Sequence, residues 1–134
     1  MITFQSSLAV DDVIIRLKEA IEAENMRLVT HINGQANAAK IGKTVPADQI
    51  LEVFRPDFAL RVWDACKAAG MDIPLRIHIY EDSVGHVMVS YREAREIFMP
   101  YQTEALQPIA EELDSIFGSI LNAVKPQPGE TTDG

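Results

Sequence analysis

Apolar side chains recur at helical spacing in three stretches of the chain, which predicts three amphipathic helices. The first stretch runs over residues 10–21, the second over residues 56–69 behind a proline that suits the first helical position, and the third follows Pro108. The apolar positions are Val10, Val13, Ile14, Leu17, Ala20 and Ile21; Phe58, Ala59, Val62, Trp63, Cys66 and Ala69; and Ile109, Leu113, Ile116, Phe117, Ile120, Leu121 and Val124. A short alanine-rich helix is expected at residues 35–41.

Between these stretches the apolar and polar positions alternate, as they do in strands with one buried face. Strands are expected at residues 2–6, 26–33 and 49–54. Residues 75–80 and 86–91 alternate in the same way, and the short polar segment between them requires an antiparallel hairpin.

The predicted elements follow the order βαβαβαββα, in which strands alternate with helices before a closing hairpin. This order predicts one α+β or α/β domain, with a mixed sheet of about five strands, helices packed on it and a C-terminal amphipathic helix. The length of 134 residues fits a single domain. We place that domain at residues 1–124, and we expect residues 125–134 to form a disordered tail because they carry no apolar anchor.

The charge distribution excludes several classes of partner. The chain has a net charge of −8, and only residues 26–80 carry an excess of basic side chains, so a nucleic-acid-binding footprint is not expected. No window approaches the roughly 20 apolar residues of a membrane span, and no signal peptide is visible. The single cysteine, Cys66, fits a reducing compartment, so we expect a cytoplasmic protein.

Several short segments, in a fixed order, resemble the domain of unknown function 302 family. They are Leu17-Lys18, Ile32-Asn33, Ala38-Ala39-Lys40-Ile41-Gly42, Ile50-Leu51, Arg55-Pro56, Ile73-Pro74-Leu75, Gly85 and Val89-Ser90-Tyr91. The resemblance covers about residues 8–99 and implies a small α/β fold that pairs as a homodimer, with no established activity. Some relatives carry cysteines at the positions of Phe54 and Leu75, so the resemblance implies no thiol mechanism here.

Metal and acid–base chemistry have few candidate residues. The histidines His31, His78 and His86 come from different predicted strands without a close-spaced pair, so we expect no metal ion and no cofactor. If His31 and His78 meet Glu52 across the sheet, the three form the site of an acid–base enzyme. Cys66 lies near the C-terminal end of its predicted helix, where a thiolate is not activated.

Two strand-to-helix junctions are the best candidates for a ligand site. If the strands 26–33 and 49–54 are parallel neighbours, Asn33 and Arg55 lie at the same edge of the sheet. Helix N-termini at that edge expose N–H groups that favour anions, and Gly34 lets a ligand approach the backbone. Arg55 can hold a carboxylate or phosphate through two hydrogen bonds.

Lys40 and His78 complete the candidate ligand-binding set. Lys40 lies in the net-positive region, and His78 shares one strand face with Arg76 and Tyr80, residue types found at interfaces. The sequence therefore predicts a homodimeric domain that binds a small anionic or polar ligand, or a protein partner. The alternatives are the acid–base enzyme and a pure protein-interaction module.

Overall fold

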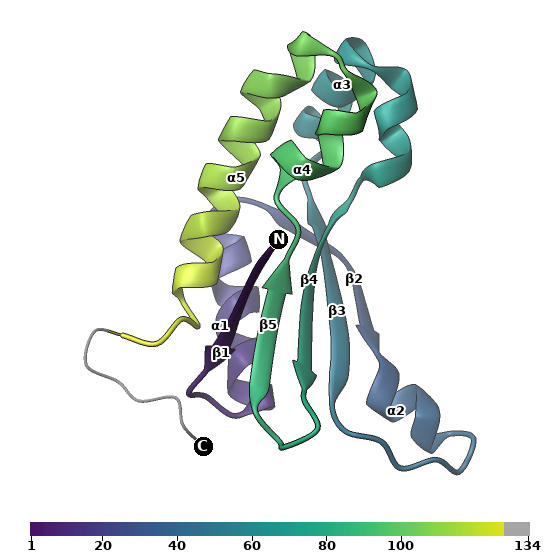
Figure 1. The fold of residues 1–134 in the computed structure, drawn as a ribbon, viewed down its shortest axis with the longest axis vertical. Helices are drawn as coiled ribbons and strands as arrows, with labels where there is room; N and C mark the ends of the chain where they lie inside the picture. Colours follow the sequence, from purple (N-terminus) through teal and green to yellow (C-terminus); the bar gives the residue numbers. More distant parts are fainter. Residues whose placement is uncertain (128–134) are drawn as a thin grey trace.

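The strand patterns produce one five-stranded sheet, which the computed structural model describes within residues 1–127 (Figure 1). The strands are β1 (Ile2–Ser6), β2 (Arg27–Asn33), β3 (Asp48–Phe54), β4 (Leu75–Glu81) and β5 (Val87–Tyr91). Their order in the sheet is β1-β5-β4-β3-β2. All four neighbouring pairs are antiparallel, so the predicted hairpin and the number of strands are confirmed, whereas the predicted mixed sheet is wrong.

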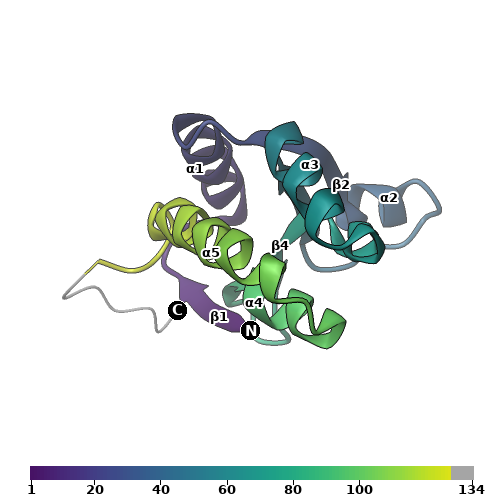
Figure 2. The same ribbon diagram turned by 90° about the horizontal axis from the view of Figure 1, so that it is seen from above.

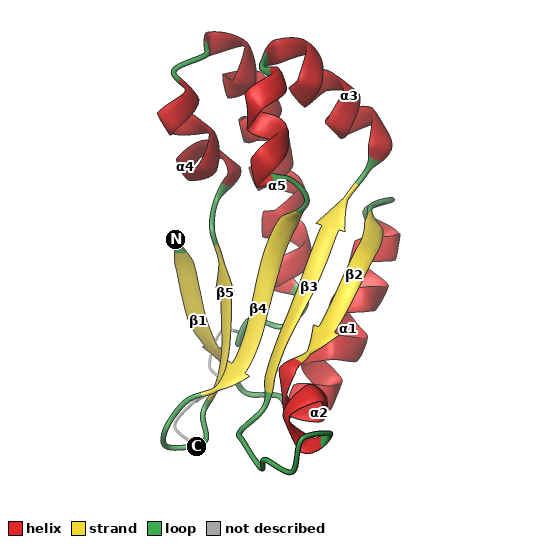
Figure 3. Cartoon of the chain, turned by 90° about the vertical axis from the view of Figure 1, so that its right-hand side faces the viewer, coloured by secondary structure: helices red, strands yellow, loops and turns green. Residues whose placement is uncertain are grey.

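The longer helices cover one face of the sheet and extend past one of its ends. The helices are α1 (Val10–Ala23), α2 (Gly34–Ala39), α3 (Pro56–Ala65), α4 (Ala94–Phe98) and α5 (Gln107–Asn122). Figure 2, viewed from above, shows α1, α3 and α5 together on one side, and Figure 3 shows the sheet with α1 and α5 behind it. The fold therefore belongs to the α+β class, with its C-terminal helix packed on the sheet through the Phe117–Tyr91 ring contact.

The helical stripes at both ends of the chain are confirmed. In α1 the side chains of Val13, Ile14 and Leu17 are buried, and Asn25 ends that region in a left-handed conformation with φ of 58°. Pro108 lies in the first turn of α5, where its missing N–H leaves no hydrogen bond unmade.

The middle helix is shorter than its stripe predicts. It ends at Ala65, because Cys66 is extended, and a 3₁₀ turn, Lys67–Asp72, follows. Trp63 is 41 % exposed, so its predicted core position is wrong. At about 100° per residue Trp63 lies about 140° around the helix from the buried Phe58. Since α3 lies beyond the end of the sheet, no strand packs against its outer side (Figure 1).

A single apolar core joins the sheet to the helices. Alternate residues of β4, Leu75, Ile77 and Ile79, point into it and are fully buried, with helix α1 packed against this strand. Each such side chain contributes roughly 1.5–3 kcal/mol to folding through burial. The other alternate residues form the opposite face, which we call the open face. The open face carries Thr3, Ile32, Asp48, Ile50, Glu52, Arg76, His78, Tyr80, Met88 and Ser90.

The C-terminal end of α5 is attached to β1. The Ser6 hydroxyl donates to the Val124 carbonyl at 2.8 Å, and the Lys125 ammonium lies 5.5 Å from the centre of the Phe4 ring.

Residues 128–134, most of the predicted tail, lie outside the described residues. None of the helices within residues 1–127 has the length and apolar character to cross a membrane.

A candidate ligand groove on the open face

The two strand-to-helix junctions lie at opposite ends of the sheet, so the predicted shared site is wrong. Asn33 pairs with Gln49 at the start of β3, whereas Phe54, the last residue of β3, pairs with Arg27 at the start of β2. Arg55 therefore lies one strand length away from Asn33. The connection between the strands returns to the adjacent position without crossing over the sheet, which makes β2 and β3 antiparallel.

At one end of the sheet, the predicted ligand residues have structural partners. The Asn33 side chain accepts a hydrogen bond from the Ala36 N–H at 2.9 Å and so caps α2. A Cβ on Gly34 would lie 3.0 Å from the Asp48 carbonyl oxygen, so this glycine allows the approach of β3. Lys40 follows α2 on an exposed turn.

At the other end of the sheet, Arg55 also has structural partners, among them the Asn25 carbonyl oxygen at 3.3 Å. Its Nε donates to one Asp57 oxygen at 2.6 Å, and a second guanidinium nitrogen donates to the other oxygen at 3.2 Å. The Arg55 guanidinium also lies 4.7 Å above the Phe58 ring. Hydrogen bonding to Arg55 lowers the pKa of Asp57, and the same contact raises the pKa of Arg55.

The proposed acid–base group does not converge. His31 lies opposite Leu51 on the helix side of the sheet, and its Nε2 is 2.6 Å from the Gln49 side-chain oxygen. His78 and Glu52 lie on the open face. Because the sheet separates His31 from the other two, the three side chains cannot act on one substrate. Within residues 1–127, moreover, no three or more His, Cys, Asp or Glu side chains form a group that could hold a metal ion.

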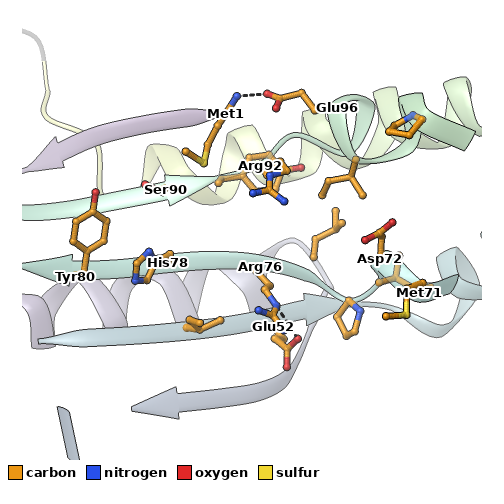
Figure 4. Close-up of a pocket in the computed structure, with 17 residues that line it drawn as sticks. Met1, Glu52, Met71, Asp72, Arg76, His78, Tyr80, Ser90, Arg92 and Glu96 are labelled. Atoms are coloured by element: carbon orange, nitrogen blue, oxygen red, sulfur yellow. Dashed lines mark hydrogen bonds and ion pairs between the residues drawn. The ribbon is translucent and has the colours of Figure 1, made fainter. Parts of the chain in front are cut away.

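A groove of about 850 Å³ runs along the open face of β4, from Tyr80 to the segment 71–74 (Figure 4). Strands β3, β4 and β5 form its floor, and the segment 71–74 and helix α4 form its upper end. His78 is the one predicted ligand residue that lines it. The His78 ring stacks on Tyr80 at 4.5 Å between ring centres, and its Nε2 is 2.9 Å from an Asp48 carboxylate oxygen.

Two arginines line the groove. Arg76 precedes Ile77 on β4 and Arg92 follows Tyr91, the last residue of β5, so both lie where the paired part of the two strands ends. Figure 4 shows both side chains at the groove. The Arg76 Nε lies 3.3 Å from a Glu52 oxygen, whereas the Arg92 side chain makes no ion pair or hydrogen bond within residues 1–127.

The floor of the groove reaches the core where β4 and β5 separate. Pairing between these strands ends at Ile77 and Tyr91, and beyond that point the buried side chains of Leu75 and Tyr91 line the groove. The Tyr91 hydroxyl donates to an Asp114 oxygen at 2.6 Å. Burial and this acceptor raise the pKa of Tyr91, so the phenol stays protonated at neutral pH.

Sequence reasoning identified the face that carries Arg76, His78 and Tyr80 but missed Arg92. The signal was available in the hairpin, because the turn fixes which residues of β4 and β5 lie opposite each other. The next residue beyond the Ile77–Tyr91 pair is Arg76 on β4 and Arg92 after β5, which indicates that both lie near the same end of the hairpin. The sequence analysis instead predicted the ligand site at the strand-to-helix junctions, from residues near the starts of helices.

Comparisons with known proteins agree with the fold. The family model described as "Domain of unknown function DUF302" matches residues 2–124. A crystal structure described as "uncharacterized conserved protein DUF302 from Bacillus stearothermophilus" is similar, with a TM-score of 0.83 and 20 % sequence identity. The similarity covers 92 % of this chain and 97 % of that chain, and at this identity it shows the fold alone. No match was found among curated proteins.

Proposed function

Because this chain belongs to the DUF302 family, whose description names no function, we propose a function from its groove: the protein binds a small anionic ligand between Arg76 and Arg92. The observation that carries this proposal is that two arginines line the same groove, and that one of them, Arg92, has no anionic partner within residues 1–127. An anion bound between them would remove their mutual repulsion.

The surroundings of the arginine pair support a ligand of low molecular weight. The net charge of −8 disfavours anions over most of the surface, so a local pair of guanidinium groups is a selective place for them. Hydrogen bonds to charged groups contribute about 1.5–3 kcal/mol each. The concave groove also favours a small ligand over the pure protein-interaction module, which would need no such cavity.

We expect Arg92→Gln to weaken binding of inorganic phosphate by about 10-fold to 150-fold, the equivalent of one lost charge-assisted hydrogen bond. The measurement is a nuclear magnetic resonance titration at constant ionic strength, which follows the backbone amides of β4 and β5. The melting temperature should stay unchanged, because the Arg92 side chain has no partner to lose within residues 1–127.

Arg16→Gln is the matched control, because it removes the same charge from α1, on the other side of the sheet. Arg55→Gln is a second control, placed at the end of the sheet where Arg55 binds Asp57. Equal phosphate affinity in the wild type and in Arg92→Gln would contradict the proposal. So would shifts that cluster around Arg55 in the wild-type titration.

We also propose that the chain forms a homodimer in the cytoplasm. Support comes from large apolar side chains on the helix surfaces, since Ile15, Leu60 and Trp63 are 54 %, 59 % and 41 % exposed. The lone Cys66 is a free thiol, which suits a reducing compartment. Sedimentation at micromolar concentration should show a species of twice the 14.9 kDa chain mass, and a single 14.9 kDa species would contradict the homodimer.

A further inference from the structure

The groove continues past the arginine pair into an apolar end. Ile73 and Pro74 line it on the side that leads into β4, and Ile97 and Pro100 line it on the side of α4. Met71 lies at the same end and is 87 % exposed, an unusual position for a long apolar side chain. The groove therefore joins a cationic centre to a wall of apolar side chains.

The carboxylates at this apolar end already have partners. Asp72 accepts a hydrogen bond from the Tyr101 hydroxyl, and Glu96 pairs with the Met1 ammonium group (Figure 4). A second anionic group on a ligand would face these two carboxylates, and within residues 1–127 no unpaired cation lines this end of the groove. The charges therefore favour a ligand with one anionic end and an uncharged remainder.

We propose, on the premise of the proposed function, that the ligand is an organic anion with an apolar body. A carboxylate lies between Arg76 and Arg92, and an acyl chain or a ring lies between the Ile73–Pro74 wall and the Ile97–Pro100 wall. The three residues from Arg76 back to Ile73 span at most about 10 Å, the length that they would have as an extended strand. That length fits a chain of medium length or a single ring with a short linker.

The direct test compares straight-chain carboxylates that share one charge and differ in apolar length. Acetate, butanoate, hexanoate and octanoate are titrated into the wild-type protein at constant ionic strength, with the backbone amides of residues 73, 75, 76 and 92–97 as reporters. Affinity should rise about twofold to fourfold with each added methylene that enters the groove. Arg92→Gln should weaken every member of the series by the same factor.

Two substitutions test the apolar end. Ile97→Thr and Met71→Ser should reduce the gain in affinity with chain length, while the affinity for acetate stays the same. Met71 is mostly exposed, so its variant is expected to fold even if Ile97→Thr, which packs partly on the core, does not. Ile15→Thr is the matched control, because it changes an exposed isoleucine on α1, away from the groove.

The outcomes separate this inference from the proposed function. If acetate and phosphate bind at the arginine pair and added methylenes bring no gain, the apolar-body inference fails and the anion site remains. If the gain survives both groove variants and disappears in Ile15→Thr, the apolar part binds elsewhere and the inference also fails. If neither phosphate nor any carboxylate shifts the reporter amides, the proposed function itself fails.

Discussion

Replacing Phe117 by alanine is expected to lower the free energy of unfolding by about 3–5 kcal/mol, the usual cost of removing a buried aromatic ring. Phe117 lies on α5 with its side chain fully buried, and its ring stacks on Tyr91 with 4.8 Å between ring centres and 9° between planes. The substitution removes this stack and leaves a cavity between α5 and the sheet. Since domains are stable by only about 5–15 kcal/mol, a large share of the stability should be lost.

Urea and thermal unfolding of the purified variants measure this effect. Phe117→Leu keeps much of the volume and should cost clearly less than the alanine variant. Ile41→Ala is the surface control, because Ile41 is 77 % exposed and its truncation should change stability by less than about 0.5 kcal/mol. Equal stability losses in Phe117→Ala and Ile41→Ala would show that the contact between α5 and the sheet is not the core contact.

Local patterns predicted most of the elements because local chemistry determines them. The stripe of α1, the position of Pro108 and the alternation of the β4–β5 hairpin all depend on residues within one turn or one strand of each other. The left-handed residue at Asn25 has the same local origin. Such features need no knowledge of which segments meet in space.

The direction of β3 relative to β2 could not be derived in that way. The connection between them holds a short helix and a loop, and its length is compatible with either a parallel crossover or an antiparallel return. The predicted parallel arrangement placed Asn33 and Arg55 at the same edge of the sheet. The antiparallel pairing places them one strand length apart. The wrong strand direction alone therefore accounts for the wrong prediction of a shared junction site.

The groove depends on contacts between segments distant in sequence, which explains why only part of it was predicted. Residue 78 was identified from its strand face, but the upper end of the groove joins segment 71–74 to α4 and to Met1. The exposure of Trp63 also depends on contacts that the local sequence does not show. Its spacing suits a buried stripe, yet it is 41 % exposed, because the 3₁₀ turn that follows α3 covers only part of the indole ring.

Replacing Asp114 by alanine should lower the free energy of unfolding by about 2–4 kcal/mol, because one carboxylate serves three donors. Its oxygens accept from the Tyr91 hydroxyl at 2.6 Å, from the Ala94 N–H at 2.6 Å and from the Arg95 N–H at 3.2 Å. Helix α4 has no side-chain cap from its own N-terminal residue, so Asp114 supplies that cap from α5. The substitution leaves a buried hydroxyl and two helix N–H groups without an acceptor.

A double-mutant cycle with Tyr91→Phe isolates the buried contact. The Tyr91–Asp114 pair should show a coupling energy of about 0.5–3 kcal/mol, whereas Asp64→Ala, which changes an exposed carboxylate on α3, should show none. Additive effects of Tyr91→Phe and Asp114→Ala would contradict the shared hydrogen bond.

Asp114 also connects the stability of the fold to the groove. Arg92 lies between Tyr91 and the start of α4, the two elements that Asp114 holds. Asp114→Asn retains one acceptor oxygen and should fold, but its weaker hold on α4 should let Arg92 move relative to Arg76. We therefore expect weaker phosphate binding in Asp114→Asn at a temperature where the variant is fully folded. Unchanged phosphate affinity in a destabilised Asp114→Asn would show that the arginine pair does not depend on this contact.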